Sequence, residues 1–132
     1  MKMREQGSSD FSDAVICEIP LKLPSLNDYV RACRANRYAG AEMKKRLEQD
    51  IGLFIRDLPI FIEPVTIIFV WQEANRKRDF DNIAFAKKYI LDALVKEGKL
   101  KDDNRRHVTG FVDRFEYGDE WKVKLIIERS KK

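Results

Sequence analysis

The sequence predicts a small α+β domain in which a mixed sheet of about four strands packs against two main helices. Two long segments, 39–58 and 81–97, carry apolar residues at helical spacing. Several shorter segments are rich in β-branched and aromatic residues, which is typical of strands. The 132 residues suit one domain with a buried core, and an apolar content of 44% argues against disorder.

The N-terminal part combines a tail, a strand and an irregular stretch. Residues 1–13, MKMREQGSSDFSD, have no apolar run and predict a flexible tail without a signal peptide. The domain is expected to cover residues 14–129, with a second tail at 130–132. Its first strand is predicted at Ala14–Ile19, and Pro20 and Pro24 make the next stretch extended. Residues 25–40 have regularly spaced arginines but no apolar stripe, so they are predicted to be irregular.

The middle of the chain predicts a helix followed by a buried strand. The apolar stripe of the helix consists of Met43, Leu47, Ile51 and Phe54. Pro59 ends this helix, because proline removes a backbone donor and clashes with the preceding turn. The segment EPVTIIFVWQE, residues 63–73, is rich in β-branched and aromatic residues and predicts a buried strand.

A second helix is predicted directly after the stretch RKRDFDN. Its apolar stripe consists of Ile83, Ala86, Ile90, Ala93 and Leu94. Gly98 is expected to end it, after about 16 residues. If this helix includes Asp81, then Asp81, Lys88 and Asp92 share its charged face.

The C-terminal part predicts a polar loop and a hairpin. The loop is KLKDDNRR, and the segments HVTGFVDRFEYG and DEWKVKLIIER follow it. We interpret these two segments as paired strands around Gly118-Asp119, because glycine and aspartate favour turns.

Positive charge is concentrated in two segments, although the net charge is only +4. Residues 27–46 contain six cations against two anions, and residues 76–88 contain five cations against two anions. Basic patches of this kind favour a polyanionic partner such as DNA. The alternative interpretation is an ordinary solvated face.

The sequence also limits where the protein works. Cys17 and Cys33 have no zinc-type spacing, and two cysteines do not form a disulfide framework. A reducing compartment is therefore expected. No apolar run approaches the length of a membrane span, so we expect a cytoplasmic protein without a membrane partner.

Two acidic pairs are candidates for chemistry. Asp79 and Asp81 lie at the predicted strand-to-helix junction, and Asp102 and Asp103 lie in the polar loop. Carboxylates suit Mg²⁺, which binds oxygen ligands and, with its waters, promotes phosphodiester hydrolysis. The alternatives are helix capping by Asp79 or Asp81, and a solvated turn at KDDN. Lys88 has the alternative of an i,i+4 pair with Asp92.

The ordered set of motifs resembles one known family. The set is RDFDN, a helix carrying KKYILDAL, a glycine and then LKDD, with LPSLNDY upstream. It resembles the RusA-type Holliday junction resolvases, a family common in prophages, over roughly residues 15–129. The resemblance implies a RusA-like fold and a homodimeric endonuclease of bacterial or phage origin. It also implies cleavage of four-way DNA junctions with Mg²⁺, or Mn²⁺ as the alternative, by attack of a metal-activated water.

The resemblance also assigns roles to residues. It implies that Asp79, Asp81 and Asp103 are the catalytic metal ligands, with Asp102 as a substitute for Asp103 or its hydrogen-bond partner. The family has a functional lysine on the helix. Counting forward from DFDN places Phe85 at the position where a close match would have that lysine. The segment between DN and LDAL is longer than in the tightest family pattern, and counting back from LDAL assigns the role to Lys88, with Lys87 as the alternative. The residues expected to contact the DNA backbone are Arg31, Arg34, Arg37, Arg76, Lys77, Arg78 and Lys87.

Two other functions remain open. A non-catalytic DNA-binding protein of the same fold would keep the basic patches but has little reason to keep three acids beside them. A Mg²⁺ nuclease that cuts flaps or forks would keep the acids but differ in the shape of its substrate.

Overall fold

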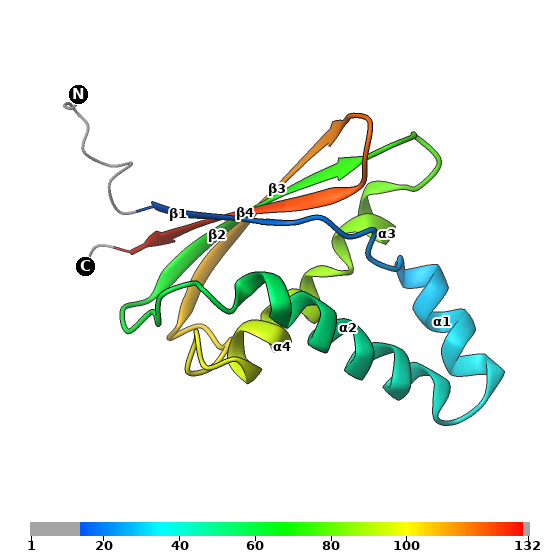
Figure 1. Ribbon diagram of the computed structural model, residues 1–132, viewed down its shortest axis with the longest axis horizontal. Helices are drawn as coiled ribbons and strands as arrows, with labels where there is room; N and C mark the ends of the chain where they lie inside the picture. Colours follow the sequence, from blue (N-terminus) through cyan, green and yellow to red (C-terminus); the bar gives the residue numbers. More distant parts are fainter. Residues whose placement is uncertain (1–13, 131–132) are drawn as a thin grey trace.

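The computed structural model describes residues 14–130 and is shown in Figure 1. The tails expected at 1–13 and 131–132 lie outside the described residues. Ser130, expected in the second tail, donates its backbone N–H to the carbonyl of Pro64 at 2.7 Å. The elements in chain order are β1 (Ala14–Ile19), α1 (Leu26–Ala35), α2 (Ala39–Ile55), β2 (Val65–Glu73), α3 (Phe80–Ala84), α4 (Lys87–Lys96), β3 (Val108–Tyr117) and β4 (Lys122–Arg129).

The four strands form one mixed sheet in the order β1-β4-β2-β3, which confirms the predicted α+β class. Strand β4 runs antiparallel to both β1 and β2, whereas β3 runs parallel to β2. The predicted hairpin of the last two strands is therefore wrong. The most apolar strand, β2, takes the place between them, because there it is covered on both edges by backbone partners.

The connection between β3 and β4 crosses the C-terminal end of β2. Gly118 donates its N–H to the carbonyl of Glu73 at 3.0 Å. The side-chain amide of Gln72 donates to the carbonyl of Glu120 at 2.9 Å. These bonds satisfy backbone groups that a tight hairpin would have paired internally.

The core lies between one face of the sheet and the helices (Figure 1). Alternate residues of β2 face it, since successive side chains of a strand point to opposite sides. The main contributors are Ile67, Phe69 and Trp71 of β2, Leu125 and Ile127 of β4, Ile51 and Ile55 of α2, and Ile90 and Leu94 of α4. The predicted helix at 39–58 is confirmed as α2, which ends at Ile55, ahead of Pro59.

Helix α1 occupies a stretch that the sequence predicted to be irregular, so that prediction is wrong. Ser25 caps the helix: its hydroxyl accepts from the N–H of Asp28 at 3.1 Å, and the Asp28 carboxylate accepts from the N–H of Ser25 at 3.0 Å. The hydrogen bond from the Ser25 backbone lowers the pKa of Asp28. Helix α1 has no buried residue, so this reciprocal cap, rather than an apolar stripe, is the feature of the sequence that marks the start of the helix.

The predicted single helix after RKRDFDN is two helices, α3 and α4. Between them Ala86 donates to the carbonyl of Ile83 at 3.2 Å, and Lys88 to that of Phe85 at 3.2 Å. These three-residue turns interrupt the ladder, although no glycine or proline marks the place. The apolar stripe is nevertheless buried as predicted, because the break keeps Ile83, Ala86 and Ile90 against the core.

Gly98 ends α4 as predicted. It has a φ of 77°, a conformation that glycine adopts without steric cost. The N–H of Lys99 bonds to the carbonyl of Leu94 at 2.8 Å, and that of Gly98 to the carbonyl of Val95 at 3.0 Å. This is a Schellman ending, which turns the chain sharply into the acidic loop.

No helix in residues 14–130 is long and apolar enough to cross a membrane.

Candidate functional site

The residues that follow β2, 73–82, form the first candidate region, which we call the junction region. A buried ion pair fixes it. Glu73 is only 3% exposed, and its two carboxylate oxygens accept from Arg78 Nε at 2.8 Å and Nη2 at 2.7 Å. Arg78 also donates to the carbonyl of Leu23 at 2.8 Å. The paired guanidinium therefore holds the chain in place immediately before Asp79.

Asp79 and Asp81 are exposed at this fixed position. Asp79 is the N-cap residue of α3, yet its side chain makes no capping hydrogen bond. Asp81 accepts one hydrogen bond, from the N–H of Asn82 at 3.0 Å. Within residues 14–130 neither carboxylate forms an ion pair. The missing capping hydrogen bond argues against the capping alternative for Asp79, whereas Asp81 lies in the first turn of α3, where a negative charge suits the helix N-terminus. Asp79 lines a small cavity of about 120 Å³ together with Ser25, Asn27, Lys77, Arg78 and Asn82.

Exposed cations and an exposed aromatic ring are close to the two acids in the chain. Arg76 and Lys77 are exposed, and the Arg76 guanidinium lies 4.0 Å from the centre of the Tyr117 ring. Phe80, between the two aspartates, stacks on Phe115 at 4.1 Å between ring centres with planes 12° apart. The junction region therefore combines exposed acids, exposed cations and an exposed aromatic ring within a short segment of chain.

The second candidate region joins α2, α4 and the loop after α4. We call it the α4–loop region. Here Lys88 lies 3.7 Å from Asp103 and 3.1 Å from Asp92, while Lys44 of α2 lies 3.0 Å from Asp92. The contact with Asp92 raises the pKa of Lys44. These side chains line a cavity of about 360 Å³ together with Glu48, Val95, Lys96 and Asp102.

Asp102 has a local role in this loop. Its Oδ1 accepts from the backbone N–H of Asp103 at 2.7 Å, and its Oδ2 accepts from the Asn104 amide at 3.2 Å. It therefore shapes the turn through bonds to the Asp103 backbone and to Asn104. The solvated-turn interpretation describes Asp102 well, whereas Asp103 contacts the helix through Lys88.

Sheet topology separates the two regions. Strands β2 and β3 are parallel, so the C-terminal end of β2 and the N-terminal end of β3 lie at opposite ends of the sheet. The junction region leaves the sheet at the first of these ends, and the loop after α4 enters it at the second. The loop after α4 nevertheless reaches Lys88, since the Asp103 carboxylate lies 3.7 Å from the Lys88 Nζ. Within residues 14–130, no three His, Cys, Asp or Glu side chains come close enough to hold a metal ion. The structure thus brings Lys88 and Asp103 together, but it does not join them to Asp79 and Asp81 in one cluster.

Lys87 faces the interior rather than the solvent. Its Nζ donates to Asp113 Oδ2 at 2.8 Å, and Asp113 Oδ1 accepts from the indole N–H of Trp71 at 2.9 Å. This network uses the charge of Lys87 to neutralise Asp113 under the sheet edge. Lys88, whose side chain is 58% exposed, is the better placed of the two lysines for a ligand.

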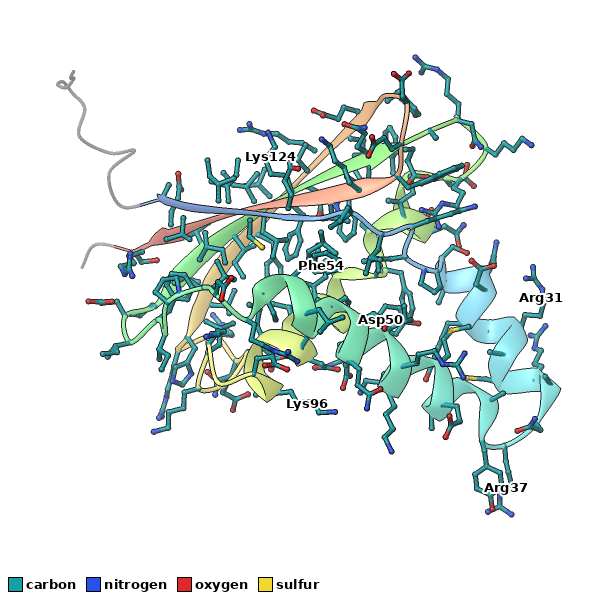
Figure 2. The ribbon with its side chains drawn as sticks, in the orientation of Figure 1. Arg31, Arg37, Asp50, Phe54, Lys96 and Lys124 are labelled. Atoms are coloured by element: carbon teal, nitrogen blue, oxygen red, sulfur yellow. The ribbon has the colours of Figure 1, made fainter. Side chains whose placement is uncertain are left out.

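The arginines predicted to contact DNA fall into two groups. Arg76 is exposed beside the junction acids, whereas Arg78 is held internally by Glu73. Arg31, Arg34 and Arg37 are exposed on α1 and the turn after it. Figure 2 shows Arg31 and Arg37 projecting from this end of the molecule, away from the sheet. Arg31 also pairs with Asp28 at 3.2 Å.

The sequence interpretation missed Glu73, Phe80 and Asp113. A signal existed for Glu73: the alternation of β2 places it on the buried face, where a charge requires a partner. Phe80 and Asp113 acquire their roles from contacts with residues far away in the chain, so no local pattern marked them.

Comparison with known proteins adds no assignment. No model of a protein family matches the sequence, and no curated protein matches it either. The resemblance to the RusA-type resolvases therefore rests on the quoted motifs alone.

Proposed function

We propose that this protein is a Mg²⁺-dependent endonuclease of the RusA type that cleaves branched DNA, with the four-way junction as its substrate. The observation that carries the proposal is the junction region. A buried ion pair fixes a strand-to-helix junction that exposes two carboxylates without partner cations among the described residues. The two carboxylates are two residues apart on this fixed junction and follow the exposed Arg76 and Lys77, so a divalent cation and a phosphate could be held together there.

The donor set fits a hard divalent cation. Mg²⁺ is commonly held by one or two carboxylates together with waters and substrate phosphates, and Asp79 and Asp81 supply that number. When bound, the cation supplies activation of the attacking water and stabilisation of the leaving oxygen. Arg76 and Lys77 attract the phosphates of the approaching strand. The Glu73–Arg78 pair keeps the two acids in position while the strand binds.

Asp103 and Lys88 enter the proposal through a second copy of the chain. The described residues of one chain do not bring Asp103 to the junction acids. A homodimer would let the α4–loop region of one copy approach the junction region of the other. Two symmetric sites would also suit a junction whose opposed strands are both cut.

A non-catalytic DNA-binding protein is the second candidate. The neutralisation of Asp103 by Lys88, and the lack of a three-acid cluster within residues 14–130, favour it. In this reading the junction acids repel DNA rather than bind a cation, so removing them would strengthen DNA binding.

The test is incubation of the full chain with a labelled four-way junction, a matched duplex, a flap and a fork, with and without Mg²⁺. Binding is measured in Ca²⁺ to separate it from cleavage. We expect Mg²⁺-dependent cleavage of the junction and none of the duplex. Cleavage of only the flap or the fork would make that structure, rather than the four-way junction, the substrate. Binding without cleavage would favour the second candidate. A protein that neither binds nor cleaves branched DNA would refute the proposal.

A further inference from the structure

The edge strand β3 carries two ring contacts at the end of the sheet where the junction region begins. Phe115 and Tyr117 are two residues apart, so they point to the same face. Phe80 covers Phe115, and the guanidinium of Arg76 covers Tyr117. Because β2 and β3 are parallel, the last residues of β3 lie beside the start of the segment that follows β2.

The ring of Phe80 is unusual in being both fixed and open to solvent. It is 55% exposed, although its stacking on Phe115 holds its plane nearly parallel to the ring beneath. The next turn of α3 is anchored by Ile83, which is 2% exposed. A ring that served only the core would bury both faces, whereas Phe80 leaves its outer face in water.

The charges beside the ring suit a nucleic-acid strand. Arg76 and Lys77 are exposed cations within four residues of Phe80 in the sequence. Tyr117, two residues beyond Phe115 on the same strand, is 39% exposed, and the Arg76 guanidinium lies over its ring. Aromatic faces interleaved with cations are the chemistry by which proteins bind unpaired nucleotides without sequence preference.

We infer that Phe80 is a stacking platform for one unpaired nucleobase of the bound DNA, an inference that rests on the proposed function. The base stacks on the outer face of Phe80 and continues the Phe115–Phe80 stack. Its flanking phosphates contact Arg76 and Lys77. The base must be unstacked from its neighbours, since a base inside a duplex has no free face. The platform therefore selects branch points and single-stranded segments over continuous duplex.

The test is a cycle that removes either the ring or the base. Binding in Ca²⁺ is measured for wild type and Phe80→Ala on a four-way junction, and on junctions with a single abasic site at each position around the branch in turn. For one position we expect the abasic site to weaken wild-type binding about tenfold. The same abasic site should have no further effect on Phe80→Ala, because the partner of the base is already gone.

Three variants serve as controls for ring shape and for the position of the removed side chain. Phe80→Tyr keeps a stacking ring and should bind like wild type, whereas Phe80→Leu keeps apolar bulk and should bind like Phe80→Ala. Ile62→Ala removes another highly exposed apolar side chain, outside the junction region, and should leave binding unchanged. Thermal unfolding of each variant shows whether it is folded.

The inference is overturned if, at every position, the loss of affinity from the abasic site and the loss from Phe80→Ala are additive. It is also overturned if Phe80→Leu binds the junction like wild type. In either case wild-type cleavage of the junction would stay intact, so the proposed function would survive. If the wild-type protein binds no branched or single-stranded DNA, the proposed function fails and the platform fails with it.

Discussion

The junction region and the α4–loop region each contain several carboxylates, but the two regions differ in how those carboxylates are paired. In the α4–loop region Asp92 contacts Lys44 and Lys88, and Asp103 contacts Lys88. In the junction region the only compensated acid is the buried Glu73, whereas Asp79 and Asp81 remain exposed and without an ion pair among the described residues. The second arrangement exposes negative charge that the fold does not neutralise.

This difference shows how a fold can separate structural from functional acids. Burying Glu73 requires a cation, because an unpaired charge in the interior is costly, and Arg78 provides it. That pair fixes the backbone, so the two following acids can be held rigidly without partners of their own. In the α4–loop region the lysines do the neutralising, which stabilises the packing of α4 on α2 but leaves less charge for a ligand.

The largest effect is expected from Asp79→Asn or Asp81→Asn. Each change removes a proposed cation ligand, and the loss of several kcal/mol of transition-state stabilisation corresponds to a rate reduction of about 1,000-fold or more. Junction cleavage in Mg²⁺ measures it, with binding in Ca²⁺ as the control that should persist. Asp92→Asn is the matched change in the α4–loop region and should have a much smaller effect on the rate. Equal rates for Asp79→Asn, Asp81→Asn and wild type would place the chemistry elsewhere.

The next largest effect concerns stability. Arg78→Ala leaves Glu73 buried without a cation, which is expected to cost about 3–5 kcal/mol of unfolding free energy. The neighbouring Arg76→Ala removes an exposed side chain and should cost less than about 1 kcal/mol. Chemical denaturation of both variants gives the comparison. Similar losses would mean that the ion pair does not hold the junction region.

A smaller effect is expected from Lys88→Ala. This lysine is exposed, so its ion pairs contribute about 1 kcal/mol or less to stability. If it contacts the scissile phosphate from a second copy of the chain, its removal should lower turnover by about 10- to 100-fold and junction affinity by less. Single-turnover cleavage together with binding in Ca²⁺ separates the two. A loss confined to affinity would make Lys88 a backbone contact only.

The salt dependence of binding gives a finer comparison of the two regions. Arg76→Gln with Lys77→Gln should reduce the slope of log affinity against log salt by about two, one for each lost phosphate contact. Lys96→Gln, from the cavity wall of the α4–loop region, is the matched change and should leave the slope nearly as it is. The opposite pattern would move the DNA to the α4–loop region.

The smallest effect tests the support of α1 beside the junction region. Ser25→Ala removes the cap of α1 and should cost about 1 kcal/mol, whereas Ser25→Thr should retain most of it. The pKa of Asp28 is lowered in the folded protein, so its contribution is present above the pKa of the unfolded chain and is lost as pH falls through the folded value. The stability difference between Asp28→Asn and wild type should therefore shrink on acidification below about pH 4, whereas the loss in Ser25→Ala should change little with pH, because that variant keeps the backbone N–H that donates to Asp28. Unfolding of both variants at a series of pH values would show this.

Local pattern was sufficient for the parts of the molecule that depend on nearby residues. The spacing of apolar residues predicted α2 and the buried stripe of α3 and α4. The β-branched runs predicted all four strands, and Gly98 marked the end of α4. The pattern Ser-x-x-Asp at Ser25 also encoded the cap of α1, but the missing apolar stripe outweighed it in the prediction.

The pairing of strands and the break between α3 and α4 were not predictable in the same way. A hairpin was the natural expectation for two consecutive strands, yet β2 competes for both partners and wins because its pairing buries more apolar surface. The break near Phe85 carries no glycine or proline, and it falls in the segment that is longer than in the tightest family pattern. It arises from packing, since Phe85 contacts Tyr29 and Tyr89 at ring distances of 5.5 and 5.7 Å.

By itself, the sequence determined the class of the fold, the composition of the core, the position of the acids and the basic segments around them. These follow from composition and from periodicities of two or a few residues, which act over short stretches of chain. Only the tertiary structure decided which charges meet: Glu73 with Arg78, Lys87 with Asp113, Lys88 with Asp103, and Asp79 and Asp81 with no cation among the described residues. Such pairings depend on strand order and on the direction of each connection, and those are set by the competition of distant segments for one core.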